Sequence, residues 1–167
     1  MGKTFTKILV PVDFSAHSSE AALYAASIAE RFFASTVILH IIAKELESHT
    51  VHRHVGHRGS PLLGPLSTPL EVPGDVMESV SIDLRERALT ALHEFLPSEI
   101  RSQPHEVLVR VGRPFEEILD MAADQHVDLI VMGTHGRSGL THAVLGSVAE
   151  RVVRLAPCPV LTMKAPA

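Results

Sequence analysis

One glycine-rich stretch constrains this chain most, because it joins an apolar segment to a segment with helical spacing. Residues 127–132 are almost continuously apolar and predict a buried strand, whereas residues 148–155 have the spacing of an amphipathic helix. Four glycines, Gly133, Gly136, Gly139 and Gly146, lie between the two segments. A strand that passes into a helix through such a turn is typical of α/β folds, in which backbone N–H groups can approach a ligand.

An anion is the ligand that best suits this turn. Unpaired amides at a helix start and the positive end of the helix dipole converge there, and Ser147 adds a hydroxyl donor. Phosphate is therefore the first ligand to consider. Glycine also permits such turns in proteins that bind nothing there, so a purely structural turn is the alternative.

The order of the glycines distinguishes this loop from two common phosphate-binding loops. It is not a P-loop, because the sequence lacks the Gly-Lys-Ser/Thr of that motif. It is not the dinucleotide fingerprint either, because the order is G-x-x-G-x-x-G rather than G-x-G-x-x-G. A different nucleotide-binding design is required.

Composition narrows the class of protein. A chain of 167 residues with 46% hydrophobic residues can form one domain with a substantial core. A net charge of −4 provides no basic surface for nucleic acid, and no segment has the length of a membrane-spanning helix or the form of an export signal. The single cysteine, Cys158, excludes an internal disulfide. We expect a soluble, cytoplasmic protein without nucleic-acid or membrane partners.

Hydrophobic periodicity predicts alternating strands and helices along the chain. Apolar runs predict five strands, at residues 7–12, 36–42, 107–111, 129–132 and 160–163. Helical spacing or helix-start signals follow each of the first four strands, with helices expected from about residues 15, 78, 114 and 148. This alternation predicts a doubly wound open α/β sandwich, with a five-stranded, mainly parallel sheet and helices on both faces.

Residues from about 44 to 77 interrupt this pattern. The segment is rich in histidine, proline and glycine and lacks hydrophobic periodicity, so we expect a flexible insertion, a long loop or lid, within a single domain of residues 1–167. Dense imidazoles can bind zinc or nickel, but no cysteine lies nearby. We therefore predict no metal site and keep a metal-binding module as an alternative for His49, His52, His54 and His57.

A carboxylate, Asp13, follows the first predicted strand. Ligands of open α/β sheets lie beyond the carboxyl ends of the strands, so Asp13 and Gly133 can line one crevice. There Asp13 would accept hydrogen bonds from ribose hydroxyls or adenine N–H groups, a short distance from the phosphates. The structural alternative is an Asp turn that caps the first helix.

The glycine stretch and four further segments resemble the universal stress protein family. Gly133-x2-Gly136-x9-Gly146-Ser147 is similar to the G-2x-G-9x-G-S/T signature of the ATP-binding branch of this family. The sequences KILVPVDFS, GRP, DLIVMG and CPVL also resemble the family, at residues 7–15, 112–114, 128–133 and 158–161. The resemblance covers nearly the whole chain except the insertion.

This resemblance implies a nucleotide site and the residues that form it. The ligand would be ATP, with or without Mg²⁺, or AMP. The adenosine would contact Pro11, Val12, Asp13 and Ile41. The ribose would lie by Met132 and Gly133, and the phosphates would be held by Gly136, Arg137, Gly146, Ser147 and Val148.

The resemblance also implies a stress-response regulatory protein that uses the nucleotide as a ligand rather than as fuel. The sequence has no Walker-type aspartate and no general base within a motif, so we predict no catalytic residues and at most weak ATP hydrolysis. A slow ATPase or nucleotidyl-transfer enzyme is the alternative, and a flavin or electron-transfer protein is another. In the family, the final strand pairs with its copy, which predicts a homodimer through Pro159 to Met163.

Overall fold

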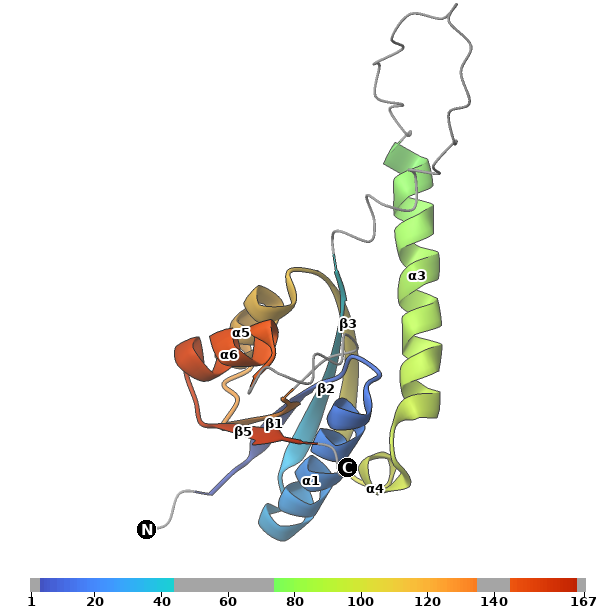
Figure 1. The fold of residues 1–167 in the computed structure, drawn as a ribbon. Helices are drawn as coiled ribbons and strands as arrows, with labels where there is room; N and C mark the ends of the chain where they lie inside the picture. The colour runs from blue at the N-terminus through green and yellow to red at the C-terminus, as the bar shows by residue number, and fades with distance from the viewer. Residues whose placement is uncertain (1–3, 44–73, 135–144, 165–167) are drawn as a thin grey trace, which may run out of the picture.

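A five-stranded sheet, parallel throughout, forms the centre of the fold (Figure 1). The computed structural model describes residues 4–43, 74–134 and 145–164. The strands, in the spatial order β3-β2-β1-β4-β5, are β1 (Lys7–Pro11), β2 (Ser35–Ala43), β3 (His105–Gly112), β4 (Leu129–Gly133) and β5 (Val160–Met163). The described helices are α1 (Ala16–Phe32), α3 (Gly74–Phe95), α4 (Ser98–Arg101), α5 (Pro114–Asp124) and α6 (Ser147–Leu155).

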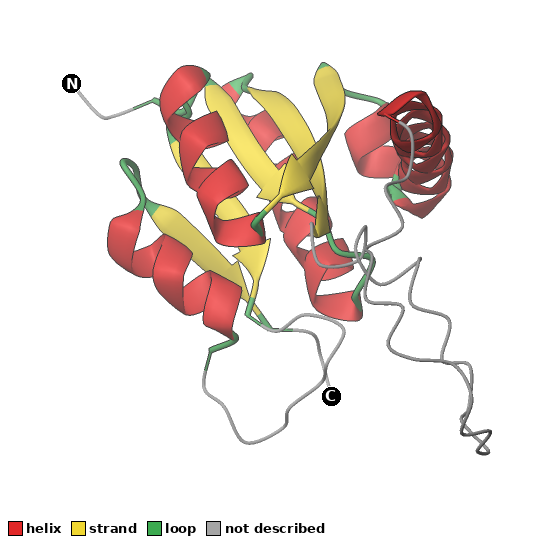
Figure 2. Ribbon diagram, turned by 90° about the horizontal axis from the view of Figure 1, so that it is seen from above, coloured by secondary structure: helices red, strands yellow, loops and turns green. Residues whose placement is uncertain are grey.

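Helices cover both faces of the sheet, as the periodicity predicts (Figures 1 and 2). One hydrophobic cluster joins Ile8 and Val10 of β1 to α1, α3 and α4, and the second joins Leu9 to α5 and α6. Successive residues of β1 therefore enter opposite cores, which explains why the strand is a continuous apolar run. The predicted doubly wound α/β fold is confirmed.

The order of the strands reverses on either side of β1. This strand pairs with β2 on one side and with β4 on the other, whereas β2 continues to β3 and β4 continues to β5. The connections that leave β1 and β4 diverge to opposite edges of the sheet. A crevice between the carboxyl ends of these two strands is the usual consequence of such a reversal.

Helix α1 packs closely on the sheet because its inner face consists of small residues. Ala21, Ala22 and Ala25 are fully buried, and Ser15 caps the helix by accepting a hydrogen bond from the Ser18 amide at 3.2 Å. The helix ends at Phe33, whose φ of 56° is in the left-handed region that commonly terminates helices. The sequence predicts this helix, and the residue that caps it is Ser15 rather than Asp13.

Two features of the helical segments differ from the sequence prediction. Helix α3 begins at Gly74, so it includes residues 74–77 of the expected insertion; Pro73 is the last proline there, and no later residue prevents the helix. Helix α4 was not predicted, because its four residues are too few for a periodic pattern, although Ile100 is fully buried. The remainder of the insertion lies outside the described residues. Among the described helices, none has the length and apolar character needed to cross a membrane.

Asp128 fastens the start of β1 to the turn before β4. Its Oδ2 accepts hydrogen bonds from the Thr6 hydroxyl at 2.6 Å, the Thr6 amide at 2.7 Å and the Lys7 amide at 3.0 Å. In return, the Asp128 amide donates to the Lys7 carbonyl at 2.9 Å. The hydrogen bonds from Thr6, the hydroxyl first, lower the pKa of Asp128 below its ordinary value of 3.8.

Replacing Asp128 with alanine should lower the free energy of unfolding at neutral pH, because three donors lose their acceptor. A carboxylate with a lowered folded-state pKa stabilises the fold above its unfolded pKa, and this stabilisation is lost as the pH falls through the folded pKa. The difference between wild type and Asp128→Ala should therefore narrow below pH 3.8. Urea unfolding at a series of pH values measures it.

Asp128→Asn is the matched control, because it keeps an acceptor oxygen but cannot carry the charge. It should lose less stability than the alanine variant at neutral pH. A stability difference between wild type and alanine variant that stays constant down to the acid end of the series would contradict the role of the charge.

Candidate functional site

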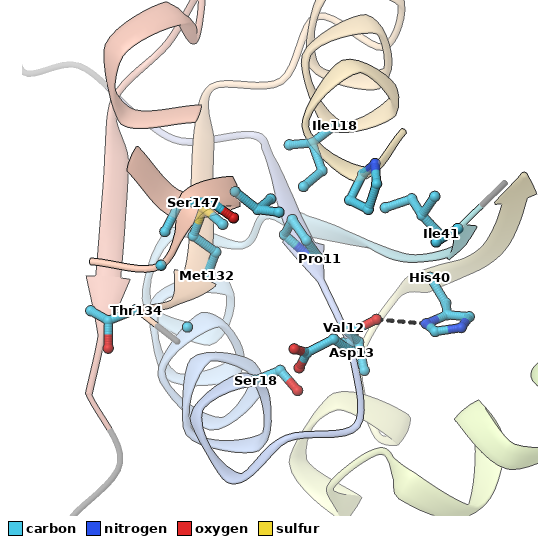
Figure 3. Close-up of a pocket in the computed structure, with 16 residues that line it drawn as sticks. Pro11, Val12, Asp13, Ser18, His40, Ile41, Ile118, Met132, Thr134 and Ser147 are labelled. Atoms are coloured by element: carbon cyan, nitrogen blue, oxygen red, sulfur yellow. Dashed lines mark hydrogen bonds between the residues drawn. The ribbon is translucent and has the colours of Figure 1, made fainter. Parts of the chain in front are cut away.

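A pocket of about 260 Å³ lies at the carboxyl ends of β1 and β4, where the strand order reverses (Figure 3). The ends of β1, β2 and β4 line it, together with residues from α1, α5 and α6. This is the crevice that the predicted topology requires. The pocket brings together nine residues predicted from the sequence: Pro11, Val12, Asp13, Ile41, Met132, Gly133, Gly146, Ser147 and Val148. The other two predicted residues, Gly136 and Arg137, lie outside the described residues.

Part of the pocket lining is apolar. Pro11, Met132 and Ile118 come from β1, β4 and α5, and Ile41 at the end of β2 is only half-buried (Figure 3). Ile118 and Met132 are 2% and 5% exposed and belong to the same hydrophobic cluster, so packing in that core holds both in place. An aromatic ring can pack against such a surface without leaving polar groups unpaired.

The start of helix α6 contributes a polar part of the lining. Gly146 is its N-cap residue and Ser147 its first residue, and no side chain caps the helix there. The helix has nine residues, and both Gly146 and Ser147 line the pocket. Uncapped amides and the positive end of the helix dipole favour an anion at this position.

Thr134 holds the two ends of the glycine stretch beside the sheet. Its carbonyl accepts a hydrogen bond from the Gly146 amide at 2.7 Å, and its own amide donates to the Met163 carbonyl of β5 at 2.8 Å. Thr134 is 8% exposed and lines the pocket. The start of α6 is therefore fixed next to the end of β4 by backbone hydrogen bonds.

Asp13 takes part in both arrangements that the sequence leaves open. Its Oδ1 accepts hydrogen bonds from the Ser15 hydroxyl at 2.6 Å and from the Ser15 amide at 3.1 Å, which is the Asp turn of the structural alternative. The residue also lines the pocket. Its Oδ2 accepts no hydrogen bond from the described part of the chain, so this oxygen can face a ligand.

Gly133 allows the end of β4 to lie directly against the first turn of α1. A Cβ at this position would be 2.8 Å from the His17 Cβ and 2.9 Å from the His17 carbonyl carbon. Such contacts are shorter than packed carbon atoms tolerate, so the close approach requires glycine. This glycine is therefore needed for the shape of the pocket, whatever the pocket binds.

Sequence reasoning missed seven residues that line the pocket: Ser18, His40, Ala43, Pro114, Ile118, Thr134 and Ala149. The rule that ligands lie beyond strand ends could have found His40 and Thr134, which stand next to predicted residues. Nothing in the sequence marks Ile118 as more than part of the buried stripe of its helix. The histidine cluster of the insertion lies outside the described residues, and the described ranges hold no group of three or more potential metal ligands.

The chain is similar to known proteins along almost its whole length. The model of the universal stress protein family matches residues 4–61 and 65–164. Universal stress protein MJ0531 of Methanocaldococcus jannaschii is 33% identical over 162 residues, which cover 97% of this chain and 84% of that protein. Universal stress protein MJ0577 of the same organism is 30% identical over 167 residues and 98% of both chains.

Solved structures share the fold. That of MJ0577, described as a hypothetical protein, superposes with a TM-score of 0.75 at 25% identity and covers 99% of both chains. A universal stress protein in complex with cAMP has a TM-score of 0.58 at 18% identity, covering 98% of this chain and 100% of that one. A universal stress protein family protein from Arabidopsis thaliana with AMP bound has a TM-score of 0.53 at 19% identity, covering 97% and 93%.

Gly133→Ala should destabilise the protein by about 1–3 kcal/mol, the usual cost of forcing an extra methyl group into a packed site. The new Cβ meets backbone and Cβ atoms of His17, which cannot move without shifting α1. Gly112→Ala is the matched control, because the three atoms nearest to its Cβ would belong to the side chain of Glu117, which can rotate away. Thermal unfolding of both variants tests this, and equal losses would contradict the close-approach argument.

Proposed function

The chain belongs to the universal stress protein family, and on that basis we propose that it binds an adenine nucleotide, ATP or AMP, in the pocket between β1 and β4. The observation that carries the proposal is the pairing of an apolar wall with an uncapped helix start in one pocket. A planar base and an anionic phosphate group need these two surfaces at opposite ends of one ligand.

In this proposal, each part of the nucleotide would contact a different part of the pocket. Adenine would pack against Pro11 and Ile41, and the Oδ2 atom of Asp13 would accept hydrogen bonds from ribose hydroxyls. The phosphates would lie at Gly146 and Ser147. The carboxylate would then be separated from the phosphates by the length of the ribose, which limits repulsion between like charges.

Relatives support this class of ligand. Structures with the same fold are described as complexes with cAMP and with AMP, so an adenosine moiety is common to both ligands. Gly136 and Arg137 complete the proposed site, with Arg137 as the cation that faces the phosphates. Mg²⁺ would accompany ATP but is not required for AMP.

In this proposal the nucleotide acts as a ligand rather than as fuel. Asp13 is the only carboxylate among the described residues of the pocket, and phosphoryl transfer needs a placed metal ion and a group that orients water. The protein would be a cytoplasmic stress-response regulator whose conformations or partners differ in their affinity for nucleotide.

We also propose a homodimer through β5. This strand pairs with β4 on one side only, its four residues are half-buried, and an open edge favours pairing with another strand. The carbonyl groups of Pro159 and Met163 point toward β4. Because the backbone N–H and C=O groups of successive residues in a strand point alternately to its two sides, those of Thr162 point to the open edge. Pairing across a two-fold axis would cover this edge.

Light scattering at micromolar concentration should return the mass of a dimer. Thr162→Pro should return a monomer that is still folded, because proline removes an edge N–H that none of the five described strands uses. Thr162→Val is the control, since it keeps the amide and should remain dimeric. A monomer mass for the wild type, with and without ATP, would exclude the dimer.

Ser147→Ala should weaken ATP binding by about 1.5–3 kcal/mol, the range for a hydrogen bond to a charged acceptor, and Gly136→Val should weaken it further. Ser147 is exposed and does not cap its helix, so its removal leaves the fold intact. Titration calorimetry with ATP and with AMP measures the affinities. Ser27→Ala, a change at an exposed serine of α1, should bind like the wild type. Equal affinities for folded wild type, Ser147→Ala and Gly136→Val would refute the phosphate assignment.

A further inference from the structure

We infer that His40 is a positioning residue, which holds the turn of residues 12–14 in the shape that directs Asp13 toward the nucleotide. The inference rests on the proposed nucleotide binding. It concerns a side chain at the end of β2 that is 8% exposed and lies at the margin of the pocket (Figure 3).

The first observation is a hydrogen bond between His40 and the chain just beyond β1. The Nδ1 atom of His40 lies 2.7 Å from the Val12 carbonyl oxygen, shown as a dashed line in Figure 3. A carbonyl can only accept, so Nδ1 carries the hydrogen and donates it. The bond fixes one ring nitrogen as the donor, and its length is that of a strong contact.

This hydrogen bond replaces a backbone bond of the sheet. The Val12 amide donates to the Leu39 carbonyl at 2.8 Å, as in a regular parallel pair. In such a pair the Val12 carbonyl would accept from the amide of Ile41, two residues beyond Leu39. The imidazole occupies that place, and the paired register of β1 and β2 ends at Pro11 and Leu39. The hydrogen bond of His40 therefore lies where the pairing of the two strands ends and the pocket opens.

The second observation is a ring contact on the other side of Asp13. The rings of Phe14 and His40 have centroids 4.6 Å apart and are tilted by 54°, and Phe95 of α3 meets Phe14 edge-on at 5.4 Å. Phe14 has a φ of 65°, a left-handed conformation that costs a residue other than glycine on the order of 1 kcal/mol. The ring contacts offset this cost and hold the turn.

Both neighbours of Asp13 are thus held by one imidazole. Val12 is held through its carbonyl and Phe14 through its ring, while Ser15 holds Oδ1 of Asp13 itself. The Oδ2 atom is the part of the carboxylate left for a ligand. His40 therefore acts on the ligand only through Asp13. Because the carboxylate is already oriented before the ligand binds, binding costs less conformational entropy.

Three variants separate the hydrogen bond from the bulk of the ring. Asparagine places its side-chain nitrogen at the position of Nδ1, so His40→Asn can keep the bond to Val12. His40→Phe keeps a ring beside Phe14 but has no donor, and His40→Gln moves its donor one bond farther from the backbone. A positioning role through the hydrogen bond predicts that asparagine rescues what the other two lose.

The readout is the preference for ATP over 2′,3′-dideoxy-ATP, which lacks the ribose hydroxyls that Asp13 would bind. His40→Phe and His40→Gln should lower ATP affinity about tenfold, the equivalent of one hydrogen bond, and should lose most of the preference for ATP. His40→Asn should keep both. Asp13→Asn should lose the same preference, and its combination with His40→Phe should cause little further loss, because the two residues act as one unit.

Other results would overturn the inference. A folded His40→Phe with the preference of the wild type would show that Asp13 does not depend on His40. If both His40→Phe and His40→Gln unfold while His40→Asn folds, the hydrogen bond only supports the fold. Loss of the preference in His40→Asn would assign the effect to the ring rather than to the hydrogen bond. A wild type that binds neither ATP nor AMP would instead refute the proposed function, and this inference with it.

Discussion

The position of β1 between β2 and β4 is the constraint on which the rest of the structure depends. Both faces of this strand are covered by helices and both edges are paired, so Ile8, Leu9 and Val10 are completely buried. A strand in this position has only its ends available for polar contacts. At one end, Asp128 binds the amides of Thr6 and Lys7; at the other, the chain enters the pocket at Val12 and Asp13. The same burial that stabilises the fold therefore leaves the ends of the sheet for polar contacts, and the pocket lies at the carboxyl end.

The fold could be predicted because each strand is an apolar run and each major helix has a distinct buried stripe or start signal. The Asp turn at Asp13 and the serine cap at Ser15 lie between the apolar run of the first strand and the helical spacing of the first helix. Local turn signals and hydrophobic periodicity therefore indicate the same boundary, and such agreement specifies a fold. Helix α4 could not be predicted, because one buried residue, Ile100, has no period. The sequence predicts the start of α3 too late. The histidine, proline and glycine content of the insertion hides the fact that Pro73 is its last proline, directly before the helix.

Residues of the candidate site could be predicted where they belong to a sequence motif. They could not be predicted where only the packing of the fold brings them to the pocket. Gly133, Gly146 and Ser147 belong to a recognisable spacing and meet in the pocket. Ile118 lines the same pocket because α5 packs on one face of the sheet, in the cluster that also contains Leu9 of β1. No local sequence pattern encodes this packing. His40 has a different reason for being missed. A histidine within an apolar strand normally indicates a satisfied core residue, and only the geometry reveals that its partner is the carbonyl next to Asp13.

Asp13 shows why a structural and a functional interpretation of one residue need not compete. A carboxylate has two oxygens, and the turn uses only Oδ1, which accepts both hydrogen bonds from Ser15. Those two bonds orient the plane of the carboxylate, so they also determine where Oδ2 points. A residue that merely formed this turn could be asparagine or serine, whereas a residue that is also to accept hydrogen bonds from two neighbouring hydroxyls of a ligand would benefit from the charge of a carboxylate. The local turn therefore orients the oxygen that would bind a ligand in the proposed site, and the strained Phe14 beside it is part of the same arrangement.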